Sequence, residues 1–160
     1  MNNYPYAQNI YQNIWVGDNI SCQDRSFLLK NKIQIIVNCT PDISHHFEPL
    51  LLKPLPNQNE YFIQYFRLPV LDNVKDEEQQ KFINLAPQIF NKLDFNKNIL
   101  IHCSAGQQRS CAFAVLVLTK KYGLSLDDAI NIIIKNRIGG FQYNGYTYHI
   151  NFQSALNQLT

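Results

Sequence analysis

The chain has 160 residues and a formal net charge of +2 at neutral pH, with 14 Lys and Arg against 12 Asp and Glu. This length suffices for one domain that buries about two thirds of its unfolded surface without disulfides or metal. The small charge and the scattered basic residues give no electrostatic case for binding nucleic acid. The chain begins with no basic or apolar stretch and its longest apolar run is short, so we expect neither a signal peptide nor a membrane span.

Four cysteines occur without close paired spacing: Cys22, Cys39, Cys103 and Cys111. This spacing favours neither a disulfide framework nor a Cys-x-x-Cys metal site. Unpaired cysteines suit a reducing compartment, cytoplasmic or otherwise intracellular. The adjacent His45 and His46 have no further ligand at metal-binding spacing, so we interpret them as solvated loop residues and expect no metal there.

The first part of the chain predicts short strands around a small helix. Residues 1–13 are polar and predict a leader segment that packs on the surface or on a neighbouring subunit. Ile14–Asp18 predicts a short strand that ends in a Gly-Asp turn. Asp24 suits the N-cap of a helix of about two turns. Residues 33–37 are apolar and β-branched, which predicts an inner strand of a sheet covered on both faces.

Residues 40–60 are expected to be irregular because their prolines prevent long regular structure. Tyr61–Leu68 alternates aromatic and polar residues, which predicts a more exposed strand that Pro69 ends. The acids at positions 76–78 then suit the first turn of a helix. That helix would have one apolar face: Phe82, Leu85, Ile89 and Leu93.

The second part predicts a buried strand at Ile99–Ile101 and a core helix over residues 110–122, which are apolar almost all round. Gly123 suits the end of that helix, and Ser125–Asp128 is similar to a capping box that opens the next one. The four aromatic residues within 139–148 suit packing on the domain better than lining a substrate rim.

A last helix, His149–Leu159, is expected to close the domain. Strands alternating with helices predict a single α/β domain over residues 1–160. We expect a central mixed sheet of about four to five strands flanked by helices, with a strand-to-helix turn before the buried helix.

That turn is His102–Ser110, with the sequence His-Cys-Ser-Ala-Gly-Gln-Gln-Arg-Ser. Such a turn directs several backbone N–H groups and the positive end of a helix dipole at one point, which suits an anion. Cys103 lies at that point, and such surroundings lower a cysteine pKa from about 8.5 to roughly 3.5 to 7.5. The thiolate is then a nucleophile at neutral pH. Arg109 returns to the same point after the loop has curled, and its planar guanidinium suits two phosphate oxygens.

A Cys followed six residues later by an Arg arises by chance in about one such chain in ten, so the spacing alone is weak. The complete pattern, however, resembles the signature of the cysteine-dependent protein tyrosine phosphatase superfamily without a gap. Other segments resemble successive blocks of its compact dual-specificity phosphatases, in that family's order: Ile35–Asn38, Tyr65–Asn73 and Leu126–Arg137. The resemblance spans nearly the whole chain, which disfavours an ordinary buried cysteine beside an unrelated arginine.

The resemblance implies a role for each residue of the turn. Cys103 attacks phosphorus to form a cysteinyl-phosphate, and Ser110 hydrogen-bonds the departing sulfur. Arg109 and the loop amides hold the phosphate oxygens, the other loop residues being Ser104, Ala105, Gly106, Gln107 and Gln108. His102 and Asn38 support the loop through hydrogen bonds, although Asn38 can also be read as a simple strand-ending residue. No metal or organic cofactor is needed.

Asp72 is the predicted general acid. It lies 31 residues before Cys103, and a path of strand end, loop, helix and strand returns the chain to the same sheet edge. The residue also matches the family's position for the acid that protonates the leaving group and then activates water. Three acids compete for this role, Asp76, Glu77 and Glu78, but helix-start charge explains them better.

The expected substrate is a phosphorylated protein. The chain has no room for the loops that build a deep phosphotyrosine-only slot in larger family members, so we expect phosphoserine and phosphothreonine to enter as well. Phosphoinositide-directed relatives carry lysines in the loop, and RNA-triphosphatase relatives carry a His and an Asn where this chain has Ala105 and Gln108. Both substrate classes, phosphoinositide and RNA 5′-phosphate, remain alternatives of lower rank.

Two further alternatives belong to other protein classes. A pseudophosphatase that only binds phosphoproteins usually lacks the nucleophile or the arginine, whereas Cys103 and Arg109 are both present. A rhodanese-like sulfur-transfer protein shares the Cys-to-Arg spacing but has no need of Asp72.

The pair Gln107 and Gln108 is uncommon, which leaves room for a tuned rate or an unusual substrate. We expect a monomer or a homodimer.

Overall fold

The computed structural model describes residues 3–45, 51–52, 61–143 and 147–160. In chain order its strands are β1 Ala7–Tyr11, β2 Ile14–Gly17, β3 Ile33–Asn38, β4 Leu51–Leu52, β5 Tyr61–Phe62, β6 Gln64–Arg67, β7 Asn98–His102, β8 Gln142–Tyr143 and β9 Thr147–Tyr148. Its helices are the 3₁₀ turn η1 Ser21–Gln23 and the α-helices α1 Arg25–Lys30, α2 Asp76–Phe90, α3 Arg109–Tyr122, α4 Leu126–Asn136 and α5 Gln153–Leu159. None of the described helices is both long and apolar enough to cross a lipid bilayer.

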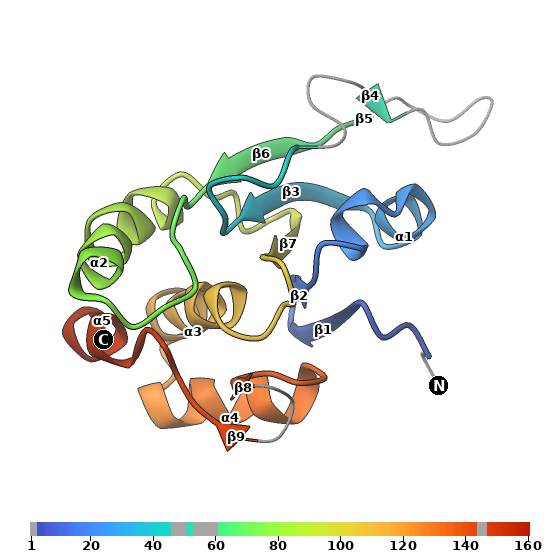
Figure 1. Ribbon diagram of the computed structural model, residues 1–160. Helices are drawn as coiled ribbons and strands as arrows, with labels where there is room; N and C mark the ends of the chain where they lie inside the picture. The colour runs from blue at the N-terminus through green and yellow to red at the C-terminus, as the bar shows by residue number, and fades with distance from the viewer. Residues whose placement is uncertain (1–2, 46–50, 53–60, 144–146) are drawn as a thin grey trace.

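The main sheet has five strands in the order β1-β2-β7-β3-β6 (Figure 1). β1 is antiparallel to β2, whereas β2, β7, β3 and β6 are parallel. The register pairs His102 with Gly17 on one side and with Asn38 on the other, so these strand ends meet at one edge. The predicted α/β domain with a mixed sheet of four to five strands is confirmed.

Both faces of the sheet are covered, as the apolar strands require. Along β3, Ile35 and Val37 belong to the large core shared with α2 to α5, while Ile36 belongs to a smaller cluster under α1. Helices α2, α3, α4 and α5 lie on one side of the sheet and α1 on the other (Figure 1). The alternation of side chains along each inner strand therefore builds two hydrophobic layers.

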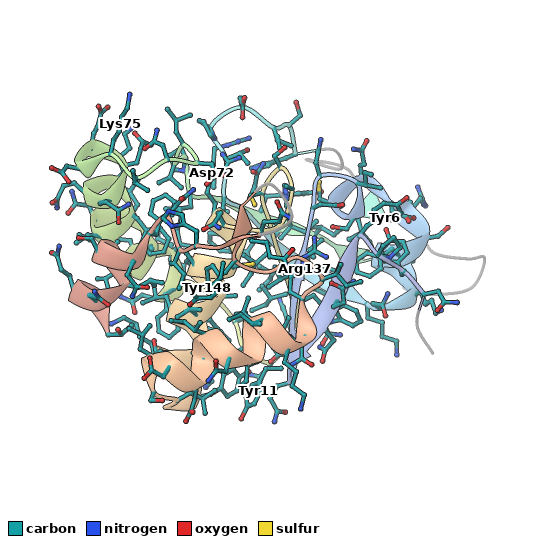
Figure 2. All side chains as sticks on the ribbon, turned by 60° about the horizontal axis from the view of Figure 1, so that its bottom comes forward. Tyr6, Tyr11, Asp72, Lys75, Arg137 and Tyr148 are labelled. Atoms are coloured by element: carbon teal, nitrogen blue, oxygen red, sulfur yellow. The ribbon has the colours of Figure 1, made fainter. Side chains whose placement is uncertain are left out.

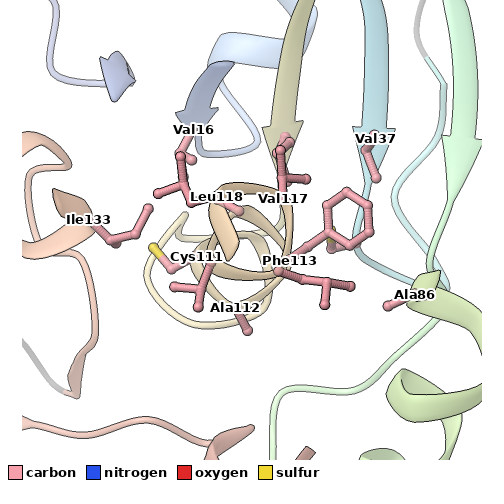
Figure 3. Packing of buried hydrophobic residues seen from close by; sticks show 14 of the residues in the cluster. Val16, Val37, Ala86, Cys111, Ala112, Phe113, Val117, Leu118 and Ile133 are labelled. Carbon is pink, nitrogen blue, oxygen red and sulfur yellow. The ribbon is translucent and has the colours of Figure 1, made fainter. Parts of the chain in front are cut away.

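Helix α3 runs through the larger layer. All of residues 109–118 are buried, and Figure 3 shows α3 between the sheet, with Val16 and Val37, and the flanking side chains Ala86 of α2 and Ile133 of α4. Gly123 ends the helix in the left-handed conformation, with φ 69°. The predicted core helix is confirmed.

The two predicted helix caps are also confirmed. The Asp24 side chain accepts a hydrogen bond from the Phe27 backbone N–H at 3.1 Å, which caps α1. The Ser125 hydroxyl accepts one from the Asp128 backbone N–H at 3.1 Å, which caps α4. Each cap satisfies a backbone donor that the first helical turn leaves unpaired.

The prediction of a separate leader is wrong for Ala7–Tyr11. These residues form β1, the edge strand of the sheet, with Ala7 and Ile10 buried. A tight connection through Gln12, with φ 48°, returns the chain into β2. Polar composition concealed this strand because Gln8 and Asn9 separate its buried residues Ala7 and Ile10, while pairing with β2 satisfies the backbone on one side.

The predicted last helix begins four residues later than expected, since α5 starts at Gln153. The backbone N–H and C=O of Asn151 bond to Gln108 and Gln79 instead of to helical partners. Tertiary contacts thus compete with helix formation at residues 149–152.

The expected strand Tyr61–Leu68 is divided. β5 pairs with β4, and β6 forms the half-exposed edge of the main sheet, as its alternating pattern predicted. Of the aromatic segment 139–148, Phe141 is fully buried in the core while Tyr148 is 56% exposed. His46 lies outside the described residues, as does much of the segment 40–60.

Candidate active site

The phosphate loop, Cys103–Arg109, connects β7 to α3 at the edge where the parallel strands end. Cys103 is only 2% exposed, and its Sγ lies 3.2 Å from the hydroxyl oxygen of Ser110 in the first turn of α3. The positive end of the α3 dipole therefore acts on the sulfur, and the hydroxyl can donate a hydrogen bond to it. Both groups are directed at the sulfur, the atom that would attack phosphorus.

The carbonyl groups of the loop are turned away from its centre. Ser104 O accepts from the Asn19 backbone N–H at 2.9 Å, and Gln107 O accepts from the Phe141 backbone N–H at 2.8 Å. Between them, Ala105 O and Gly106 O both accept from the Arg137 guanidinium, at 3.2 and 2.9 Å. In a trans peptide the next N–H points opposite to the C=O, so the four N–H groups that follow are directed toward the inside of the turn. A curl of inward N–H groups is an anion site.

Gly106 is the one loop position where a side chain is excluded. Its φ is +69°, a conformation that L residues rarely adopt. A Cβ there would lie 2.4 Å from Nη2 of Arg137 and 2.6 Å from the Gly17 carbonyl oxygen. The loop can therefore close over β2 and Arg137 only with glycine at this position.

Arg137 holds the phosphate loop against the first strand. Beyond the two loop carbonyls, its Nη1 donates to the Gln8 side chain at 2.7 Å and to Pro5 O at 3.1 Å. Figure 2 shows Arg137 between α4 and the N-terminal strand. Burial lowers the pKa of this guanidinium from its ordinary value, and the nearby thiols and Asp18 oppose that effect. β1, which we had predicted to be a leader, is thus part of the support for the site.

Arg109 is the first residue of α3 and is 9% exposed. Its Nη1 donates to Val70 O at 3.0 Å, which ties the phosphate loop to the segment that carries Asp72. Its Nε is buried and has no hydrogen-bond partner among the described residues. A buried donor without an acceptor is costly, so this nitrogen is suited to a phosphate oxygen.

Asp72 lies in the acid loop, Val70–Lys75, between β6 and α2, and its side chain is exposed (Figure 2). Oδ1 of Asp72 accepts from Nδ2 of Asn151 at 2.6 Å. The Asn151 backbone N–H donates in turn to Oε1 of Gln108 at 2.9 Å. Two hydrogen bonds therefore connect the carboxyl group to the residue that precedes Arg109.

The three acids that compete with Asp72 for the general-acid role lie in the first turn of α2. Asp76 and Glu77 are exposed on the first turn of α2, as helix-start charges are. Glu78 is buried and accepts from the Leu71 backbone N–H at 2.7 Å and from Lys81 at 3.0 Å. Burial raises the pKa of Glu78, but these hydrogen bonds outweigh it and leave the pKa below its ordinary value. Glu78 thus anchors the acid loop as a carboxylate.

Residues 14–156 match the protein-family model described as "Dual specificity phosphatase, catalytic domain". The chain belongs to the dual specificity phosphatase family. Human "Dual specificity protein phosphatase 9" is 28% identical over 132 residues, which cover 82% of this chain and 32% of that protein. Human "Dual specificity protein phosphatase 21" is 26% identical over 129 residues, which cover 79% of this chain and 60% of that protein. The chain thus spans only part of these relatives' length.

Solved structures show the same fold. Human DUSP28 superposes with a TM-score of 0.72 at 17% identity, covering 98% of this chain and 93% of that one. The human "tyrosine phosphatase-like serine/threonine/tyrosine-interacting protein" superposes with a TM-score of 0.67 at 23% identity, covering 97% and 95%. At these identities the likeness concerns the fold of the phosphatase domain alone.

One predicted support of the phosphatase loop is not where we expected it. The Asn38 amide donates to Ile43 O at 2.8 Å, and its oxygen accepts from the hydroxyl and the N–H of Thr40 at 2.7 and 3.1 Å. These bonds shape the turn after β3 instead of reaching the phosphate loop, because Thr40 and Ile43 are closer along the chain. The next residue, Cys39, donates its backbone N–H to His102 O at 2.8 Å, at the end of β7 directly before the loop.

His102 is 1% exposed, and its Nδ1 lies 3.2 Å from the Cys103 carbonyl oxygen. Two of the other three buried cysteines, Cys39 and Cys111, share the larger hydrophobic core with Cys103. Burial, followed by the nearby Cys103, raises the pKa of Cys111 to about 12 and that of Cys39 well above its ordinary value. These two thiols are therefore uncharged at neutral pH and lack nucleophilic character.

Sequence reasoning missed the residues that hold the site from outside the motif: Gln8, Glu78, Gln79, Arg137 and Asn151. Each is a polar residue within an otherwise ordinary helix, strand or loop. All except Gln8 are nine-tenths buried, and Gln8 is half-buried and accepts from Arg137. Among the described residues, no three His, Cys, Asp or Glu side chains gather as a metal site would require.

Proposed function

We propose that this protein is a protein phosphatase that hydrolyses phosphotyrosine and phosphoserine or phosphothreonine through a cysteinyl-phosphate. The single observation that carries the proposal is the convergence at one sheet edge of the Cys103 sulfur, the inward N–H groups of the turn and the unpartnered Nε of Arg109. These groups match a nucleophile and a binding site for three phosphate oxygens. We also propose that residues 1–160 act as one catalytic domain.

In the first step the Cys103 thiolate attacks phosphorus and the bond to the leaving oxygen breaks. The loop N–H groups and Arg109 hold the three other oxygens as the charge on these oxygens redistributes. Because the N–H groups and Arg109 are already oriented, no free energy is spent on reorienting them in the transition state. The proton of Asp72 passes to the leaving phenol or alcohol oxygen. The products are a cysteinyl-phosphate and the dephosphorylated side chain.

In the second step a water oxygen attacks phosphorus and the phosphorus–sulfur bond breaks. Asp72, now ionised, takes the proton of the water. The Ser110 hydroxyl, 3.2 Å from the sulfur, donates to the departing thiolate and stabilises it. Inorganic phosphate leaves, and both Cys103 and Asp72 have returned to their starting states.

The loop side chains support a protein substrate. The loop side chains carry no charge at four positions, which are Ser104, Ala105, Gln107 and Gln108. The loop therefore has no lysine that could bind the additional phosphates of an inositol headgroup. The names of the relatives, dual specificity protein phosphatases, point in the same direction. A thiolate nucleophile further suggests a reducing, intracellular compartment.

A phosphoprotein-binding role without catalysis is the second candidate, because one structural neighbour is named as a phosphatase-like interacting protein. Assays on para-nitrophenyl phosphate and on matched phosphotyrosine, phosphoserine and phosphothreonine peptides separate the candidates. We expect phosphate release from the aryl ester and from all three peptides. Binding of phosphopeptides without phosphate release would support the interacting protein and contradict the enzyme.

A further inference from the structure

A chain of hydrogen bonds runs from the end of the phosphate loop to the proposed acid. Gln108 Oε1 accepts from the Asn151 backbone N–H at 2.9 Å, and Nδ2 of Asn151 donates to Oδ1 of Asp72 at 2.6 Å. Asn151 follows β9 and precedes α5, so this link comes from a third part of the chain. It joins two loops that are far apart in the sequence.

We propose that Asn151 is a positioning residue that orients the carboxyl group of Asp72, and that Gln108 keeps Asn151 in register with the phosphate loop. This inference rests on the proposed role of Asp72 as general acid. It also assigns a role to Gln108, the second residue of the uncommon Gln pair.

The orientation follows from the chemistry of a carboxylic acid. A protonated carboxyl group carries its proton on one oxygen, and the other oxygen is an acceptor only. Because Asn151 donates to Oδ1, that oxygen is the acceptor and Oδ2 carries the proton. Asn151 therefore selects the oxygen from which the leaving group is protonated. An amide donor also serves the ionised state, in which the same carboxylate must accept a proton from water.

Asn151 is itself held on both sides. The backbone carbonyl oxygen of Asn151 accepts from Nε2 of Gln79 on α2 at 2.7 Å. Oε1 of Gln79 accepts in turn from the Ala155 backbone N–H at 3.0 Å. Gln79, Gln108 and Asn151 are 5%, 3% and 7% exposed, whereas Asp72 is exposed. A buried residue that is bonded through its backbone N–H and C=O thus fixes a carboxyl group that would otherwise sample several rotamers in solvent.

Gln108 has the length that this arrangement needs. From the residue before Arg109, its Nε2 donates to His149 O at 2.6 Å while its Oε1 accepts from Asn151. One side chain therefore binds both ends of the segment 149–151. Apart from Asp72, the side chains of this network are neutral amides: Gln79, Gln108 and Asn151. The charged groups that contact the acid loop are Arg109 at Val70 O and Glu78 at the Leu71 N–H.

The test compares Asn151→Ala with Asp72→Asn on an alkyl phosphate and on an aryl phosphate with a good leaving group. We expect Asn151→Ala to lower kcat on the alkyl ester by about tenfold, because a misplaced catalytic group loses rate steeply, with KM almost unchanged. The loss should nearly vanish on the aryl ester. Asn157→Ala is the matched control and should behave like wild type, since Asn157 is an exposed asparagine of α5 whose side chain accepts a hydrogen bond from Gln153.

The double variant Asp72→Asn with Asn151→Ala distinguishes positioning from support of the fold. If Asn151 acts through Asp72, its loss should cost nothing further once Asp72 is removed. An equal tenfold loss in both backgrounds would overturn the proposal. If the effect of Asp72→Asn does not depend on the leaving group, Asp72 is not the general acid and the inference about Asn151 fails with that role. If Asp72→Asn shows the dependence and Asn151→Ala does not, only the inference about Asn151 fails.

Asn151→Asp keeps the shape and the backbone contacts of the residue and therefore serves if the alanine variant does not fold. It replaces the donor with a second carboxyl group, which favours the protonated state of its neighbour. We expect the basic limb of the kcat–pH profile to move to higher pH. An unmoved limb together with wild-type kcat on the alkyl ester would contradict the proposal.

Discussion

The phosphate loop and the acid loop meet at the same sheet edge but are held in different ways. The phosphate loop is nearly continuous with β7 and α3, and its own carbonyl groups are bonded outward to Asn19, Arg137 and Phe141. The acid loop is exposed and is tied at three successive residues by side chains of other elements: Val70 by Arg109, Leu71 by Glu78, and Asp72 by Asn151.

The difference concerns what each loop has to do. In the proposed mechanism the N–H groups that bind phosphate need one geometry throughout the reaction, and backbone bonding supplies it. The proposed acid, Asp72, must act on leaving groups of different sizes, and an exposed side chain on a tethered loop suits that task. Damage to the phosphate loop should therefore affect every substrate, and damage to the acid loop only those that need a proton.

Replacement of the nucleophile should have the largest effect. Cys103→Ser should lower kcat by at least about 10⁴-fold on all substrates, because a serine hydroxyl is not ionised at neutral pH. Phosphate should still bind, since the loop N–H groups and Arg109 are unchanged, and calorimetric titration measures this. More than a trace of wild-type turnover would show that another group is the nucleophile.

Arg109→Lys should follow, with kcat lowered by about 10³-fold or more, because an ammonium cannot hold two oxygens as a planar guanidinium does. Arg109 also bonds Val70 O, so this change affects both loops at once. Arg67→Lys is the control, since Arg67 donates to Thr40 O, outside the phosphate loop and the acid loop. A raised KM with normal kcat would mean that Arg109 binds the substrate without stabilising the transition state.

Asp72→Asn separates the two loops most clearly. On alkyl phosphates we expect kcat to fall by at least about 10²-fold, and on aryl phosphates with good leaving groups by only a few-fold. The acid limb of the pH profile should persist while the basic limb flattens. Asp76→Asn, an exposed acid of α2, should leave the profile unchanged; if instead it removes the basic limb, our choice of acid is wrong.

Glu78→Gln should have the smallest effect, and that effect should be on the stability of the fold. The pKa of Glu78 is lowered below its ordinary value of 4.5, so the ionised side chain stabilises the fold above that pH and the contribution is lost as pH falls through the lower folded value. We expect the variant to lose about 1 kcal/mol at pH 7, roughly 2 to 4 °C in Tm. The difference from wild type should shrink as the pH falls below 4.5 and disappear below the lowered pKa of the folded state.

Glu77→Gln is the control for this measurement, because the Glu77 side chain is 76% exposed and lies 3.8 Å from Lys81. Such exposed pairs contribute little. Equal destabilisation by both changes, or a Glu78 effect that does not depend on pH, would contradict the anchoring role of Glu78.

Much of the site could be predicted from the sequence because its chemistry lies in one short segment. Cys103, Gly106, Arg109 and Ser110 fall within eight consecutive residues, and the strand before and helix after them have clear apolar patterns. Caps at Asp24 and Ser125 depend on contacts three residues away, so they too were predictable. Local geometry determines such features whatever the rest of the chain does.

Tertiary structure decided what holds the motif in place. Arg137 bonds Gly106 from 31 positions away and Pro5 from 132, and Asn151 bonds Asp72 from 79. The Asn38 side chain accepts a hydrogen bond from nearby Thr40, and β1 pairs with β2 in the sheet although its sequence is polar. A buried amide or guanidinium bonds whichever backbone group the fold brings near it, and no spacing in the sequence marks that partner. The sequence by itself therefore determined the reactive turn, the inner strands and the main helices, while packing decided the edge strand β1 and selected the residues that orient the turn.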